Sequence, residues 1–197
     1  VFADADLDAA VEGAMIAKMR NVGEACTSAN RFHVHESVAG EFAEKLAARM
    51  GALKVGRGTE VGTDVGPLID DDQRDKVAEL VDDAVGKGAK ALVGGRRVDG
   101  AGSFYEPTVL TGIADDARLL TEEIFGPVAP IATFATEDEA VAAANSTPFG
   151  LISYVFAKEP GTGVKLARRM ESGMVAVNRG LASDPAAPFG GMKESGL

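Results

Sequence analysis

The sequence has a single cysteine and no apolar run long enough to cross a membrane. Cys26 therefore has no intrachain disulfide partner, and the composition suits a reducing cytosol. Neither a secretory signal nor a stretch of about 20 apolar residues is present, so we expect a cytoplasmic protein without a membrane partner. Basic residues are outnumbered, at 20 against 30 acidic ones. The net charge of −10 disfavours nucleic acid as a partner, although solubility alone also explains it.

The remaining composition is that of a folded globular chain. It has 197 residues, of which 46% are hydrophobic and 25% charged. Neither an interdomain linker nor an internal repeat is visible, so we expect one domain with a sizeable core. Because the chain begins with Val1 and ends inside a loop motif, we expect a processed chain or an excised piece of a longer one.

Hydrophobic periodicity predicts alternating helices and strands. Apolar spacing favours helices over residues 7–20, 38–50, 72–85, 137–145 and 163–170, with Asp6 as the cap of the first. Short β-type runs cover residues 32–34, 91–93, 128–134, 151–156 and 174–177. This alternation predicts an α/β fold with a largely parallel sheet and helices on both faces.

The 24 glycines do not form a nucleotide-binding loop. Gly86, Gly88 and Ala91 match a G-x-G-x-x-A spacing, but they follow a predicted helix and precede a strand. A dinucleotide-binding motif needs the opposite order, because the phosphates bind at the N-terminus of the following helix. We interpret Gly86 and Gly88 as residues that stop the helix.

The two histidines do not indicate a metal site. His33 and His35 lie two residues apart on a predicted strand, so both side chains point to one face. No cluster of further ligands accompanies them, and we predict a polar strand face and no bound metal.

Cys26 lies where a nucleophile can be exposed. A lone cysteine is more often an inert buried side chain. Here it follows the predicted helix end near Gly23 and precedes a strand, a junction that can turn backbone N–H groups toward a developing negative charge.

Five segments together resemble conserved motifs of the aldehyde dehydrogenase superfamily. Residues 20–31 (RNVGEACTSANR) resemble the active-cysteine motif, and residues 121–128 (TEEIFGPV) the nicotinamide-side motif. Residues 63–68 (TDVGPL), 173–178 (GMVAVN) and 188–197 (PFGGMKESGL) also fit. They occur in the family's order, and the resemblance covers essentially the whole chain.

The resemblance implies the chemistry of the site. Cys26 would attack the aldehyde carbon as a thiolate and pass through a thioester, its own backbone N–H binding the oxyanion. Glu123 would bind the nicotinamide ribose of NAD or NADP, and Phe125 would pack near the nicotinamide ring. Without the resemblance, the residues themselves favour a capping or surface carboxylate for Glu123 and a core aromatic for Phe125.

Within the family, the chain most resembles succinate-semialdehyde and glutarate-semialdehyde dehydrogenases. In those enzymes, the residues matching Arg20 and Ser183 bind the substrate's distal carboxylate, and Phe189 is implied to line the same pocket. Arg20 could instead cap its helix. Some relatives carry a second cysteine where this chain has Ser28, which excludes that disulfide switch here.

Several parts of such an enzyme would lie outside this chain. The resemblance makes residues 1–197 a partial catalytic domain, with the coenzyme domain and the general-base glutamate upstream and an intersubunit tail downstream. The parent would be a homodimer or homotetramer that oxidises a small aldehyde. The alternatives are a dehydrogenase of an uncharged or cationic aldehyde, or a non-catalytic scaffold.

Overall fold

The computed structural model describes residues 1–196. The helices are α1 (Leu7–Met19), η1 (Arg20–Gly23), α2 (Glu36–Gly51), α3 (Asp71–Gly86), η2 (Arg118–Leu120), α4 (Glu137–Asn145) and α5 (Pro160–Ala167). The strands are β1 (Phe32–His35), β2 (Lys90–Val93), β3 (Thr108–Thr111), β4 (Val128–Phe134), β5 (Phe149–Gly150), β6 (Ile152–Val155), β7 (Met174–Val177) and β8 (Met192–Lys193). All five predicted α-helices and all five predicted strands are present, so the predicted α/β fold is confirmed.

The first predicted helix, α1, begins directly after the predicted capping residue and ends close to the predicted glycine. The Asp6 carboxylate accepts the backbone N–H of Ala9 at 3.0 Å, which satisfies one of the free donors at the start of α1. At the other end, the helix stops at Met19, and Gly23 takes a positive φ of 83°. The predicted helix stop after α3 is also confirmed, since α3 ends at Gly86 and Gly88 has a φ of 103°.

Contacts divide the chain into two compact units, each built from discontinuous segments. Unit 1 contains residues 1–17, 33–42 and 133–197, and unit 2 contains residues 18–32 and 43–132. Because the chain passes from one unit to the other several times, no single linker marks the division in the sequence.

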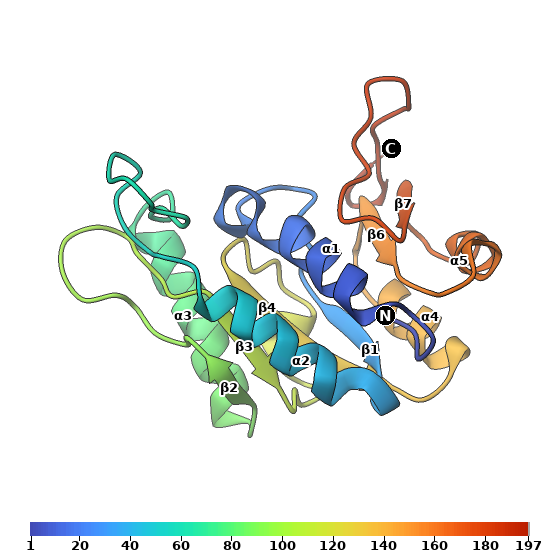
Figure 1. The fold of residues 1–197 in the computed structure, drawn as a ribbon, viewed down its shortest axis with the longest axis horizontal. Helices are drawn as coiled ribbons and strands as arrows, with labels where there is room; N and C mark the ends of the chain where they lie inside the picture. The colour runs from blue at the N-terminus through green and yellow to red at the C-terminus, as the bar shows by residue number, and fades with distance from the viewer. Residues whose placement is uncertain (197) are drawn as a thin grey trace. The chain divides into compact units, whose positions relative to one another are not determined.

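The core of unit 2 lies between α3 and the sheet. In this sheet, β3 is parallel to β4 on one side and antiparallel to β2 on the other (Figure 1). Leu80 and Val81 of α3 pack in one cluster with Leu110 of β3. The neighbouring Val109 points to the opposite face and is also fully buried, so both faces of the sheet are covered.

Unit 1 contains two smaller pairs of strands. β6 and β7 are parallel, and β5 and β8 are antiparallel. Val155 of β6 packs with Val141 of α4 and Leu166 of α5 in a separate core cluster. Within residues 1–196, no helix has the length and apolar character of a membrane span.

The start of α4 provides a test of local stability. The Thr136 hydroxyl accepts the Glu139 N–H at 3.2 Å, and the Glu139 carboxylate accepts the Thr136 N–H at 3.3 Å, which forms a capping box. We expect Thr136→Ala in the full-length protein to cost about 1 kcal/mol and to lower the thermal unfolding midpoint. Thr59→Ala, at an exposed loop position, is the control. Equal midpoints for the two variants would contradict a stabilising cap.

Candidate active site

The segment that leads into Cys26 has an unusual backbone. Asn21, Val22 and Gly23 all have positive φ, at 50°, 60° and 83°. A β-branched residue such as Val22 rarely adopts this conformation, which costs about 1–3 kcal/mol. The Asn21 side-chain amide donates to the Glu24 carbonyl at 2.7 Å, and the Glu24 N–H donates to the Asn21 carbonyl at 2.9 Å. These two bonds hold a strained turn immediately before the cysteine.

Cys26 itself lies in the next turn. The Ser28 N–H donates to the Ala25 carbonyl at 2.8 Å, so that Cys26 and Thr27 form the tip between them. The Cys26 side chain is exposed, whereas Thr27 is buried. The predicted exposure of Cys26 at a helix-to-strand junction is therefore confirmed for this chain.

Glu24 fixes the Cys26 segment to a loop far away in the sequence. Its carboxylate accepts the backbone N–H of Ile69 at 3.1 Å. Burial raises the pKa of Glu24, the Ile69 hydrogen bond opposes that rise, and the Asp70 carboxylate adds to it. The sequence alone did not single out Glu24, because its partner lies 45 residues away.

The second loop of the site carries Glu123 and Phe125. Leu119 and Ile124 are fully buried in the α3 cluster and anchor the loop, while Glu123 is exposed between them. Phe125 is half-buried and has a positive φ of 51°. The loop therefore displays a carboxylate and an aromatic ring from a backbone that is fixed on its apolar side.

Gly23 brings the two loops into direct contact. A Cβ atom on Gly23 would lie 2.2 Å from the Gly126 carbonyl oxygen, well inside any allowed contact. Only glycine fits this position, both for its φ and for the closeness of Gly126. The turn before Cys26 and the end of the Glu123 loop are thus packed backbone against backbone.

Lys18 binds the same carbonyl from the last turn of α1. Its Nζ donates to the Gly126 oxygen at 3.2 Å, and its side chain is only 1% exposed. Burial lowers the pKa of Lys18 to about 7, although the Glu123 carboxylate acts in the opposite direction. A buried amine of this kind marks a place where packing overrides the usual preference of lysine for water.

Residues after Cys26 and at the start of α3 complete the support of the Glu123 loop. Asn30 bonds to three backbone groups of the loop, at Leu119, Glu122 and Ile124. Arg31 donates to the Leu120 carbonyl at 2.7 Å. The Gln73 side chain donates to the Ile124 and Phe125 carbonyls at 2.9 and 2.8 Å. Sequence patterns do not reveal these polar side chains, because every partner is a backbone group about 50 to 90 residues away.

The remaining predicted site residues lie in different surroundings. Arg20 is exposed in unit 2, and among residues 1–196 its guanidinium makes no hydrogen bond to the last carbonyls of α1. Ser183 is half-buried and Phe189 is 57% exposed, and both belong to unit 1. Unit 2 therefore contains Cys26, Arg20, Glu123 and Phe125, while the approach of Ser183 and Phe189 to Cys26 stays a prediction.

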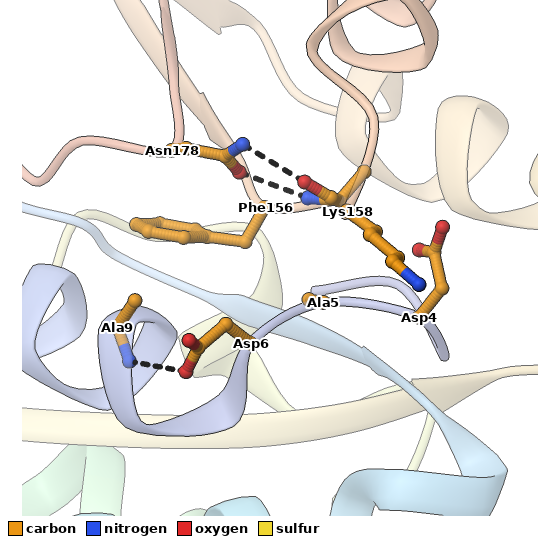
Figure 2. A pocket seen from close by; sticks show the side chains of 8 residues that line it. Asp4, Ala5, Asp6, Ala9, Phe156, Lys158 and Asn178 are labelled. Atoms are coloured by element: carbon orange, nitrogen blue, oxygen red, sulfur yellow. Dashed lines mark hydrogen bonds between the residues drawn. The ribbon is translucent and has the colours of Figure 1, made fainter.

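A pocket of about 470 Å³ lies in unit 1 and contains none of the predicted site residues. It is lined by Asp4, Ala5, Asp6, Ala9, Phe156, Ala157, Lys158 and Asn178 (Figure 2). Asn178 bonds to both backbone groups of Ala157, at 2.8 and 3.0 Å. We place the candidate site at the Cys26 loop, because that loop carries the predicted nucleophile and the pocket is lined by no cysteine.

The predicted shared strand face of His33 and His35 is confirmed. Phe32 and Val34 of β1 are buried, while His33 and His35 are half-buried on the opposite face. His35 Nδ1 lies 2.8 Å from the Ser37 hydroxyl. Across the described residues, no group of three or more His, Cys, Asp or Glu side chains is arranged to hold a metal ion.

Comparison with known proteins identifies the family. The model of the aldehyde dehydrogenase family matches residues 1–197. The chain belongs to the aldehyde dehydrogenase family. It is 55% identical to a succinate-semialdehyde dehydrogenase from Paenarthrobacter nicotinovorans and 50% identical to a glutarate-semialdehyde dehydrogenase from Pseudomonas putida, over 197 residues each.

A solved structure supports the same relationship. The chain matches the crystal structure of a succinate-semialdehyde dehydrogenase from Burkholderia pseudomallei with a TM-score of 0.97 and 51% identity. In each comparison the whole chain is covered. It spans 44% and 41% of the two relatives and 41% of the Burkholderia structure, so it corresponds to less than half of such an aldehyde dehydrogenase.

The exposure of Cys26 leads to a direct chemical test. We expect iodoacetamide to alkylate Cys26 in the folded 197-residue chain, because the side chain is exposed at the tip of its turn. Peptide mass spectrometry, with and without prior denaturation, measures the modified fraction. Labelling that occurs only after denaturation would contradict an accessible thiol.

Proposed function

We propose that this chain supplies the nucleophile and part of the coenzyme site of an NAD(P)-dependent semialdehyde dehydrogenase, which oxidises succinate semialdehyde to succinate. The observation that carries the proposal is the contact of two loops at Gly126. One loop exposes Cys26, and the other displays Glu123 and Phe125.

Cys26 is the group that forms the covalent bond in this proposal. Its thiolate attacks the aldehyde carbon and gives a thiohemiacetal, whose oxyanion accepts a hydrogen bond from the Cys26 backbone N–H. Loss of hydride leaves a thioester, and water then releases the carboxylic acid and the free thiol. The general base that activates this water would come from outside residues 1–197.

The residues of the second loop fit a nicotinamide coenzyme. Members of the family use NAD or NADP, which accepts the hydride when bound. Glu123 is an exposed carboxylate suited to accept hydrogen bonds from ribose hydroxyls, and Phe125, two residues later, has a half-buried ring. Most of the coenzyme would be bound by a domain outside this chain.

The position of Arg20 favours a substrate with a carboxylate group. It lies six residues before Cys26, is exposed, and does not donate to the carbonyls of its own helix. An exposed guanidinium that is not bonded to its own helix can bind a substrate carboxylate through two parallel hydrogen bonds. Ser183 would add a hydroxyl donor and Phe189 an apolar wall. Relatives named for succinate and glutarate semialdehydes agree with this substrate class.

Substitution of Arg20 tests the substrate in the full-length enzyme. We expect Arg20→Ala to lower kcat/KM for succinate semialdehyde by about 1.5–3 kcal/mol of transition-state binding, the range for a charged hydrogen bond. Butanal lacks the distal carboxylate and should be affected far less. The measurement is kcat/KM for both aldehydes.

A matched substitution controls for the loss of a surface charge. Arg57→Ala removes another exposed arginine, from the loop before Val65, and should leave both substrates unchanged. Equal losses for the two aldehydes in Arg20→Ala would mean that Arg20 supports the fold, and the acidic substrate would lose its main support.

The isolated chain should be unable to oxidise aldehydes in repeated catalytic cycles. Residues 1–197 would lack the coenzyme domain and the general base, so neither hydride transfer nor hydrolysis of a thioester is supported. Absorbance at the NADH and NADPH maximum, with succinate semialdehyde and either coenzyme, measures this. Steady production of either reduced coenzyme by the purified chain would contradict the proposal that the coenzyme domain and the general base lie outside residues 1–197.

A further inference from the structure

Asn30 lies four residues after Cys26, and its side chain brackets Glu123. The Asn30 amide oxygen accepts the Ile124 N–H at 2.8 Å, and the amide nitrogen donates to the Glu122 carbonyl at 2.9 Å. The same nitrogen lies 3.3 Å from the Leu119 carbonyl. Both peptide groups adjoining Glu123 are therefore connected to the segment that carries the nucleophile.

We propose that Asn30 is a positioning residue that fixes Glu123 for coenzyme binding and ties its loop to the Cys26 segment. The inference rests on the proposed function, because it takes Glu123 as a ligand of the coenzyme ribose. Asn30 itself touches neither coenzyme nor substrate in this role. It acts through the backbone on both sides of Glu123.

The surroundings of Glu123 explain why a positioning residue is needed. The Glu123 side chain is exposed, so it is not enclosed by packing that would fix its direction. Phe125, two residues after Glu123, has a positive φ of 51°, a conformation that persists only when neighbouring contacts hold it. Gln73 binds the carbonyls of Ile124 and Phe125, which lie after Glu123. Of the Asn30 and Gln73 side chains, only that of Asn30 forms hydrogen bonds on both sides of Glu123.

The chain contains a matched control for Asn30. Asn145 is also half-buried, and its side chain brackets Met170 in the same way. Its amide nitrogen donates to the Arg169 carbonyl at 2.9 Å, and its amide oxygen accepts the Glu171 N–H at 2.9 Å. Asn145 belongs to unit 1, and its side chain bonds to the backbone at residues 169 and 171, so its loss removes a similar bridge in a different segment.

The test compares Asn30→Ala, Asn145→Ala and Glu123→Gln in the full-length enzyme. Isothermal titration calorimetry with NAD+ and with NADP+ gives the Kd of the tighter coenzyme, and steady-state kinetics give KM for coenzyme and for succinate semialdehyde. We expect Asn30→Ala to raise the coenzyme Kd and KM about ten-fold, which corresponds to about 1.4 kcal/mol. The aldehyde KM should stay within about two-fold, and Asn145→Ala should change neither constant.

Each outcome decides between the inference and its alternatives. A wild-type coenzyme Kd in Asn30→Ala, with a raised Kd in Glu123→Gln, overturns the role of Asn30 and leaves the proposed function intact. A wild-type Kd in Glu123→Gln overturns the assignment of Glu123, and the inference with it. Equal effects of Asn30→Ala and Asn145→Ala show a general loss of stability and also overturn the inference.

A second pair of variants covers a failure of Asn30→Ala to fold. Asn30→Asp keeps the side-chain volume and the acceptor for the Ile124 N–H, but it places a carboxylate against the Glu122 carbonyl. We expect the same rise in coenzyme Kd, with Asn145→Asp as its control. A wild-type Kd in folded Asn30→Asp would overturn the inference.

Discussion

The Gly126 carbonyl is the point on which the arrangement of the candidate site depends. This oxygen lies so close to Gly23 that no side chain fits between them, and it accepts a hydrogen bond from the buried amine of Lys18. One loop places Cys26 and the other places Glu123, so a shift at this contact would move the two groups relative to each other. A single backbone oxygen thus links the loop of the candidate nucleophile to the loop of the proposed coenzyme site.

Strain and polar support occur together around this contact. Asn21, Val22 and Phe125 all have positive φ, and hydrogen bonds from the Asn21 and Gln73 side chains hold the same segments. Strained backbone persists only where surrounding contacts compensate for it, and it concentrates at functional sites. The buried side chains of the α3 cluster supply the rigid base from which these loops project.

Local patterns predicted the helices well and the short strands less well. The predicted helix at residues 163–170 begins earlier, at Pro160, because proline fits the first turn of a helix, and it ends earlier, at Ala167. The strands β3, β5 and β8 were not predicted, and β5 and β8 have only two residues each. The burial of β3 comes from its neighbours in the sheet, which a local pattern does not contain.

The sequence by itself determined the α/β fold, the family and the identity of the candidate nucleophile, because helix periodicity, helix stops and family motifs are all written in the order of residues along the chain. The family resemblance singled out Cys26, Glu123 and Arg20 as candidate site residues, and their roles stay predictions. Only the tertiary structure revealed Lys18, Glu24, Asn30 and Gln73 as supports of the site. Each of these side chains bonds to a backbone group 45 to 108 residues away. Because backbone N–H and carbonyl groups are the same in nearly every residue, the sequence does not show which one a side chain will bind, and only the folded structure does.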